Sequence, residues 1–306
     1  MGQFNLPSST TFMKEPQTLP RKHDAISSQP FWQPFEPPRN SGTVKERQPS
    51  CASIAEQFAI DPATGQLFMH APGLELRFPM VVVRHGETDG NVCGMFQGRI
   101  ENPLNVTGKA QAEQAAQQLY AELTDLLGEQ FTALASAGKL IVLTSPLSRA
   151  QDTAQAFIGY VQRQIGIVLD MRVEEALAEI CFGAIEGQTL ESIADEQLRS
   201  LALRYRAQEA MIDWHGTGES FCDVIRRAKG LLERLNGQYG RQKVVVIGFA
   251  HGILINALRT VVGDRTLVEE NGHVAFRKHI IANAEAYWLG HSRELAAQLF
   301  HNLRSS

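Results

Sequence analysis

Three runs of mostly hydrophobic residues mark the chain from residue 80 onward. Met80–Val83, Lys139–Thr144 and Lys243–Gly248 are rich in β-branched and aliphatic residues without regular polar alternation. This pattern is typical of strands buried on both faces of a sheet. Segments with a helical repeat lie between and after these runs. They predict helices over about residues 107–127 (with Asn105 as N-cap), 147–165, 190–211, 221–239 and 253–262.

Strands that alternate with helices predict an α/β protein. We expect a three-layer sandwich with a mostly parallel central sheet, and a small helical cap from the variable stretch at about residues 191–217. Residues 286–289 and 296–300 suggest a final hairpin. Residues 66–70 and 74–78 resemble two short strands around the turn at Pro72-Gly73. In parallel sheets, active sites lie beyond the carboxyl ends of the strands.

Composition divides the chain into three parts. Eight of the thirteen prolines lie in the first 50 residues, mixed with Ser, Thr and Gln. Such a stretch has little apolar surface to offset the loss of chain entropy, so residues 1–50 are predicted to be a disordered tail. Residues 51–77 read as an N-terminal extension with a possible hairpin, and residues 78–306 as the catalytic domain.

Charge and cysteine content exclude several classes of protein. The formal net charge of −4 gives no basis for general attraction to nucleic acid or to an anionic membrane. The four cysteines are widely spaced and show no metal-ligand pattern, which favours reduced thiols in a cytosolic protein. No secretory signal or membrane-length apolar run is visible. We therefore expect a cytoplasmic protein, and the sequence leaves a homo-oligomer open.

Arginine and histidine residues follow three of the predicted strands. Met80–Val83 runs into Arg84-His85-Gly86, and Lys243–Gly248 leads to His251-Gly252. The strand ending at Thr144 is followed by Arg149 in the first turn of a helix, where anions bind favourably. A guanidinium group binds phosphoryl oxygens through two parallel hydrogen bonds. An imidazole nitrogen can donate a hydrogen bond to such an oxygen or attack phosphorus. We expect these residues to converge at one edge of the sheet. The sequence therefore predicts a site that binds a phosphoryl group.

The chain also resembles a known family, the histidine phosphatase superfamily, in its phosphoglycerate mutase-like branch. The resemblance covers residues 78–306 and rests on motifs in the family's order. These are Arg84-His85-Gly86-Glu87-Thr88 with Asn91 and Gln97-Gly98, then Ser145-Pro146-Leu147 with Arg149-Ala150, Leu177 with Glu179, Phe182-Gly183 with Glu186-Gly187, Gly218-Glu219-Ser220, and His251-Gly252.

The resemblance implies a role for each matching position. His85 is the expected nucleophile, and Arg84, Arg149 and His251 with Gly252 form the expected phosphate pocket. Asn91 and Gln97-Gly98 are expected to contact the phosphate and the substrate, and Glu179 to act as acid and base. A nucleophilic imidazole must be neutral, so its other nitrogen should donate to a backbone carbonyl. No metal or cofactor is expected.

Three functions fit this set of residues. We favour a phosphomonoester hydrolase that acts through a phosphohistidine on an unidentified phosphorylated small molecule. A phosphoglycerate mutase is the alternative, although the stretch from Glu179 to His251 is short for one and Arg204-Tyr205-Arg206 matches its paired-arginine contact poorly. A non-catalytic phospho-ligand scaffold, with the N-terminal tail as its interaction element, fits less well because the nucleophile, the acid and the pocket are all present.

Overall fold

The computed structural model describes residues 54–301, without the side chain of His301. The predicted disordered tail lies outside the described residues. The strands are β1 Phe58–Ile60, β2 Leu67–Met69, β3 Met80–Arg84, β4 Leu140–Thr144, β5 Met171–Val173, β6 Val245–Ala250 and β7 Ala286–Trp288. The α-helices are α1 Asp89–Val92, α2 Val106–Leu127, α3 Gln130–Ser136, α4 Ser148–Ile165, α5 Glu196–Arg206, α6 Phe221–Tyr239, α7 Gly252–Val261 and α8 Ser292–His301. Short 3-10 turns cover Glu175–Leu177, Gly183–Ile185 and Arg265–Leu267.

A five-stranded sheet in the order β5-β4-β6-β3-β7 forms the middle of the domain. Neighbouring strands are parallel except for β7, which pairs antiparallel with β3 at one edge. The three strands that the sequence predicted are therefore adjacent, with β6 between β3 and β4. Arg84 lies opposite Ala250, and Thr144 opposite Phe249. This register brings the carboxyl ends of all three strands to one edge.

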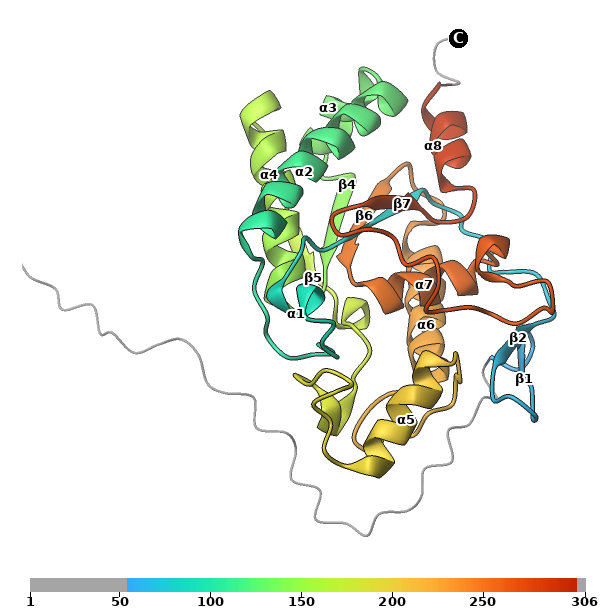
Figure 1. Ribbon diagram of the computed structural model, residues 1–306. Coiled ribbons are helices and arrows are strands. Elements are labelled where there is room, and N and C mark those ends of the chain that lie inside the picture. The colour runs from blue at the N-terminus through green and yellow to red at the C-terminus, as the bar shows by residue number, and fades with distance from the viewer. Residues whose placement is uncertain (1–53, 302–306) are drawn as a thin grey trace, which may run out of the picture. The chain divides into compact units, whose positions relative to one another are not determined.

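Helices cover both faces of the sheet, as Figure 1 shows for α2, α3 and α4 on one side and α6 and α7 on the other. Alternate residues of one strand face opposite layers. Val81 and Val83 of β3 pack in the core that includes α2, α4 and α8, whereas Met80 and Val82 pack in the core that includes α6 and α7. Such two-sided burial explains the uninterrupted hydrophobic runs, and it confirms the predicted three-layer α/β sandwich.

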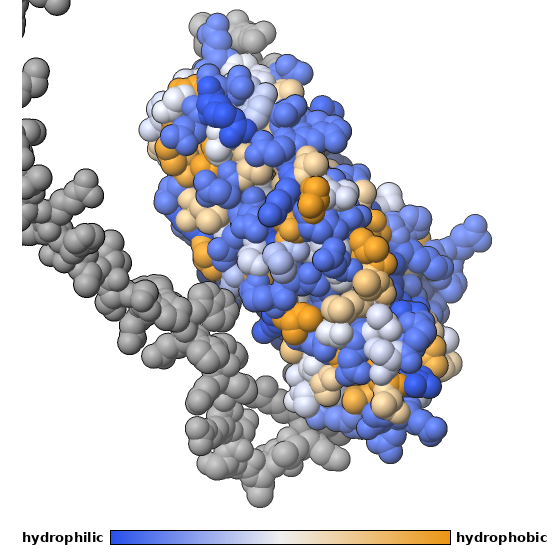
Figure 2. Space-filling model, turned by 60° about the vertical axis from the view of Figure 1, so that its left-hand side comes forward, coloured by the Kyte–Doolittle hydropathy of each residue, from blue (hydrophilic) through white to orange (hydrophobic). Residues whose placement is uncertain are grey.

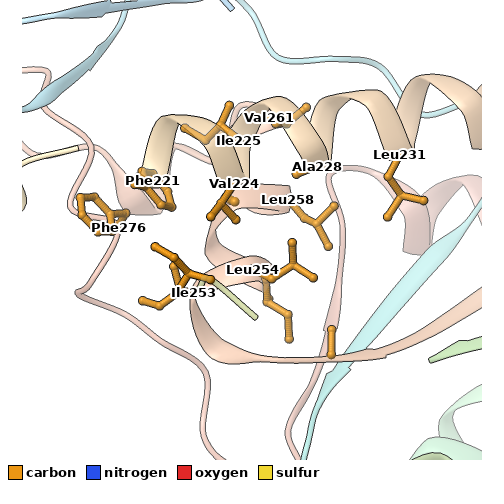
Figure 3. Close-up of a cluster of buried hydrophobic side chains, with 14 of the residues drawn as sticks. Phe221, Val224, Ile225, Ala228, Leu231, Ile253, Leu254, Leu258, Val261 and Phe276 are labelled. Atoms are coloured by element: carbon orange, nitrogen blue, oxygen red, sulfur yellow. The ribbon is translucent and has the colours of Figure 1, made fainter. Parts of the chain in front are cut away.

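The layer of α6 and α7 forms much of the larger core. Figure 3 shows Val224 and Ala228 of α6 near Leu254 and Leu258 of α7. Each of these four residues is fully buried. This packing fixes the position of α7, and therefore of His251, which immediately precedes it.

Several predicted elements need correction. Strand β6 runs two residues later than predicted, because Phe249 and Ala250 still pair with its neighbours. The helix predicted over 190–211 is the shorter α5, capped by the Asp195 side chain. The helix of the cap is thus present but only eleven residues long.

The prediction of a final hairpin was wrong for its second strand. Residues 292–301 form helix α8 rather than a strand. Ser292, Ala296 and Phe300 recur every four residues and are the buried side of this helix. The alternation of hydrophobic residues at 296, 298 and 300 was too short to distinguish a strand from a helix.

The N-terminal extension also pairs differently from the prediction. The segment at residues 66–70 does contain a strand, β2, but its partner is β1 rather than residues 74–78. Leu74 instead donates its backbone N–H to the Val261 carbonyl at 2.8 Å. The extension is therefore attached to the end of α7.

The surface seen in Figure 2 is mostly hydrophilic, with small separate hydrophobic areas. Among the described residues, no helix is long and apolar enough to cross a membrane. Cys93 and Cys181 are free thiols.

Candidate functional site

His85, Ser145 and His251 directly follow the ends of β3, β4 and β6. The backbone N–H of His85 donates to the Ala250 carbonyl at 3.0 Å, and that of Ser145 to the Phe249 carbonyl at 3.0 Å. The His85 and His251 ring centres are 5.1 Å apart. The sheet therefore brings together two histidines that are far apart in the sequence.

The environment of His85 keeps its imidazole neutral. The side chain is only 3% exposed. This burial lowers the pKa of His85 well below its ordinary value, and the charges of Arg149 and Arg84 lower it further. Its Nδ1 lies 2.6 Å from the Gly86 carbonyl oxygen, so Nδ1 carries the proton and donates there. Nε2 then keeps the lone pair that a nucleophile needs.

Arg84 and Arg149 are held in place by backbone carbonyls rather than by carboxylates. Arg84 Nη1 donates to the Ile281 carbonyl at 2.8 Å. Arg149 donates from Nη1 to Ile100 at 2.9 Å and from Nη2 to Gly98 at 2.8 Å. The Nε atoms of both arginines are buried without a hydrogen-bond partner among residues 54–301. Buried donors of this kind suit an anionic ligand.

His251 is fully buried beside them. Burial lowers its pKa well below the ordinary value, and the charge of Arg149 adds to this effect. Its Nε2 lies 2.8 Å from the Ser145 hydroxyl oxygen, which also accepts the Leu147 N–H at 3.2 Å. If the Ser145 hydroxyl donates to Nε2, the proton of the neutral ring is on Nδ1. This Nδ1 is a third buried nitrogen without a partner among the described residues.

Glu179 lies at the N-terminus of α7, the helix that begins directly after His251. Its carboxylate accepts the backbone N–H groups of Ile253 at 3.2 Å and Leu254 at 3.1 Å. The N-terminal N–H groups of a helix favour a carboxylate in this position. Burial lowers the pKa of both Arg84 and Arg149, and the charge of Glu179 opposes that shift in each. The charge of this one carboxylate thus favours the charged form of both guanidinium groups.

Asn91 and Gln97 are joined to the nucleophile loop through Thr88, which caps α1. Asn91 Oδ1 accepts the Thr88 N–H at 3.1 Å, completing a capping box. The Thr88 hydroxyl lies 2.8 Å from Gln97 Oε1. The turn after the nucleophile is therefore fixed by Thr88 together with Glu87, which accepts from the Asn105 amide at 3.0 Å.

At Gly98 and at Gly252, a side chain would collide with neighbouring atoms. Gly98 has φ +50°, and a Cβ there would lie 2.0 Å from Oε1 of Glu186. Glu186 is a structural residue, since this oxygen accepts the backbone N–H groups of Arg99 and Phe182. A Cβ on Gly252 would lie 2.8 Å from Ile280 and 3.5 Å from Arg84 Nε. The chain can approach the pocket closely only with glycine at these positions.

The loop after α7 supplies contacts that sequence reasoning did not assign. Asn283 Nδ2 and the Ala284 N–H both donate to the His85 carbonyl, at 3.0 and 3.1 Å. Ala284 has φ +60°, a strained conformation for a residue with a Cβ. Asn256 of α7 holds the loop by donating to the Phe276 carbonyl at 2.8 Å.

Two further residues were missed in the same way. The Thr153 hydroxyl accepts the Gly86 N–H at 3.1 Å and donates to the Arg149 carbonyl at 2.7 Å, which ties the nucleophile loop to α4. Ser145 contacts His251 as described above. Ser145 lies within a quoted motif and Thr153 lies one helical turn after Arg149, but the contacts themselves depend on the fold. Among residues 54–301, no three His, Cys, Asp or Glu side chains form a group that could hold a metal.

Comparison with known proteins identifies the family of the chain. The family model described as histidine phosphatase superfamily (branch 1) matches residues 80–296. The chain belongs to this superfamily. It is therefore an enzyme of the phosphatase type.

The individual proteins that match the chain share only a moderate part of its sequence. The chain is 27% identical over 179 residues to phosphoserine phosphatase 1 of Hydrogenobacter thermophilus, covering 58% of this chain and 73% of that protein. It is 34% identical over 187 residues to glucosyl-3-phosphoglycerate phosphatase of Mycobacterium tuberculosis, covering 58% and 72%. The solved structure of a mycobacterial glucosyl-3-phosphoglycerate phosphatase matches with a TM-score of 0.50 and 27% identity, covering 69% of this chain and 89% of that one.

Proposed function

We propose that this enzyme hydrolyses phosphomonoesters of small molecules through a phosphohistidine on His85. The observation that carries the proposal is the state of His85. It is a buried, neutral imidazole whose Nδ1 faces the Gly86 carbonyl, between two arginines whose Nε atoms are unpartnered among the described residues. The catalytic domain is residues 78–306, and residues 51–77 are an extension of it.

In the first step, the substrate phosphate lies among Arg84, Arg149 and His251. These residues stabilise the charge on its oxygens, and His251 donates from Nδ1. His85 Nε2 attacks phosphorus in line, so that a P–N bond forms as the P–O bond to the leaving group breaks. Glu179, protonated at this stage, gives its proton to the leaving oxygen.

In the second step, Glu179 acts as a base. It takes a proton from water, whose oxygen attacks the phosphorus on His85. The P–N bond breaks, the electron pair returns to Nε2, and inorganic phosphate is released. Glu179 is then protonated for the next cycle. The catalytic cycle therefore needs no reactant other than the phosphomonoester and water.

The remaining predicted residues position the phosphate. Because Asn91 Oδ1 already accepts hydrogen bonds within the loop, its amide nitrogen is the group available to a phosphate oxygen. The Gly98 carbonyl orients Arg149, while Gln97 lies beside it and contacts substrate. Gly252 leaves room for the guanidinium of Arg84. Relatives named for phosphoserine and glucosyl-3-phosphoglycerate support a phosphorylated small molecule as the substrate.

The test is release of inorganic phosphate from an aryl phosphate. His85→Ala should abolish release, whereas replacing an exposed histidine outside the site, His70→Ala, should leave it unchanged. A brief reaction of the wild type with ³²P-labelled substrate should leave acid-labile label on the protein, and His85→Ala should leave none. Turnover by His85→Ala would overturn the proposal. So would efficient isomerisation of 3-phosphoglycerate, with a bisphosphorylated primer, in the absence of phosphate release.

A further inference from the structure

A largely buried guanidinium group holds the backbone of the segment that contains Glu179. Arg227 of α6 donates from Nη1 to the Ala176 carbonyl at 2.9 Å and to the Ala178 carbonyl at 2.8 Å. Its Nη2 lies 3.4 Å from the Glu179 carbonyl oxygen. Only 17% of the Arg227 side chain is exposed. The position of this backbone segment therefore depends on one side chain from another element.

Glu219 fixes that guanidinium group and binds the same segment itself. One oxygen of its carboxylate accepts a hydrogen bond from Arg227 Nε at 3.1 Å, and the other accepts one from Nη2 at 3.0 Å. The second oxygen also accepts from Arg99 Nη2 at 3.0 Å and from the Cys181 N–H at 3.1 Å. The Glu219 N–H in turn donates to the Cys181 carbonyl at 2.7 Å. Arg227 and Glu219 therefore bind the backbone on both sides of Glu179 along the chain.

The carboxyl group of Glu179 is held by a different helix. Its oxygens accept backbone N–H groups from the first turn of α7. Arg227 belongs to α6, and the next residue, Ala228, lies near Leu258 of α7 in the core between these helices (Figure 3). The backbone and the carboxyl group of Glu179 are thus held by two helices that pack together. Loss of the contacts from α6 would leave only the contacts from α7 to hold the carboxyl group.

We infer that Arg227, fixed by Glu219, is a positioning residue for the proposed acid, and that it sets where the Glu179 carboxyl group meets the leaving oxygen. The inference rests on the proposed function and adds a residue to it. Proton transfer requires the acid and the leaving oxygen to be within hydrogen-bond distance. A displacement of about 1 Å can cost about 100-fold in rate.

Substrates with different leaving groups separate positioning of the acid from general support of the fold. In the first step the P–O bond breaks, and Glu179 gives its proton to the leaving oxygen. The alkoxide of glycerol 3-phosphate needs this proton, whereas the 4-nitrophenolate of 4-nitrophenyl phosphate leaves readily without it. The value of kcat/KM covers the steps up to the departure of the leaving group. The ratio of kcat/KM for the two substrates does not depend on how much of a variant is folded.

The ratio also removes a second effect of the Arg227 charge. The pKa of His251 is lowered well below its ordinary value by burial, then by the charges of Arg149 and His85, and then by that of Arg227. In the proposed mechanism His251 donates to the phosphate, which is the same group in both substrates. A change in its protonation would therefore alter both values of kcat/KM by the same factor.

Arg227→Gln should lower kcat/KM for glycerol 3-phosphate by about 10- to 100-fold, a part of the roughly 100- to 10,000-fold that general acid catalysis supplies. It should lower kcat/KM for 4-nitrophenyl phosphate far less. Glu219→Gln keeps the shape of the side chain, and it should change the ratio in the same direction. Arg227→Lys keeps the charge without the planar fork, so its ratio should lie between those of the wild type and Arg227→Gln. Glu179→Gln gives the full size of the effect.

Arg226→Gln is the matched control, because Arg226 precedes Arg227 on α6 and pairs with Asp223 at 2.6 Å. It should leave the ratio unchanged. If Arg227→Gln and Glu219→Gln lower both substrates by the same factor while Glu179→Gln changes the ratio, the pair only supports the fold and the inference is overturned. An unchanged ratio in Glu179→Gln would overturn the acid role of Glu179 and the inference with it. Either result leaves the phosphohistidine to the labelling experiment above.

Discussion

The two neutral histidines should make the stability of this protein fall as the pH is lowered. His85 and His251 have folded-state pKa values well below the ordinary one, chiefly because they are buried and secondly because Arg149 is near. In the unfolded chain each regains a pKa of about 6.5. Below that pH the unfolded chain binds protons that the native protein does not. The free energy of unfolding therefore decreases as the pH falls through this value.

The magnitude follows from linkage. Each histidine costs about 1.4 kcal/mol for every pH unit below about 6.5, until its folded-state pKa is reached. Between pH 7.5 and 5.5 one histidine thus removes about 1 kcal/mol, and the two together remove about 2–3 kcal/mol. For a domain with a typical stability of about 5–15 kcal/mol, this is a large fraction.

Urea unfolding at pH 7.5 and 5.5, followed by far-UV circular dichroism, measures the effect. Other titrating groups also contribute, so the informative quantity is the difference between variants in the loss of stability. His85→Asn and His251→Asn should each reduce that loss by about 1 kcal/mol. Asn283→Ala alters a neighbouring side chain without removing a titratable group, so it should show the wild-type loss.

The reasoning is refuted if both histidine variants lose as much stability as the wild type. That result would mean that the pKa of each imidazole is the same in the native protein as in the unfolded chain, so that burial does not disfavour the charged form. The native protein would then accept protons on both imidazoles in the same pH range as the unfolded chain, beside the charges of Arg84 and Arg149.

Two further substitutions test how the pocket is built. Ser145→Ala removes the hydroxyl 2.8 Å from His251 Nε2, and should lower kcat about tenfold while costing about 1–3 kcal/mol of stability; wild-type turnover would show that the hydroxyl does not orient the ring. Gly98→Ala places a Cβ 2.0 Å from a carboxylate oxygen at φ +50°, whereas Gly94→Ala at φ +68° meets nothing within 4 Å. In thermal unfolding, Gly98→Ala should therefore lose clearly more than the roughly 1 kcal/mol expected from backbone strain alone, and equal losses would contradict the predicted clash.

Much of the fold could be predicted because its signals are local. Met80–Val83 is a continuous apolar run in which three residues are β-branched, as is typical of a strand buried on both faces. Asn105 could be recognised as the N-cap of α2 from the residues next to it, and its side chain does accept the Gly108 N–H at 2.7 Å. By contrast, α8 was mistaken for a strand, because a short apolar segment has no clear period until it is known which side is buried.

The sequence by itself determined which chemical groups follow the strands, since Arg84-His85 and His251 are contiguous with the runs that form β3 and β6. Only the tertiary structure decided how these groups are held. Arg149 is oriented by the carbonyls of Gly98 and Ile100, about 50 residues away, and His251 by Ser145, separated by 106 residues. Such contacts depend on how layers pack and on the register of parallel strands. The local periodicity of the sequence does not determine the packing of the layers or the register of the strands. The chemical groups of the site could therefore be predicted from the sequence, but the contacts that orient them could not.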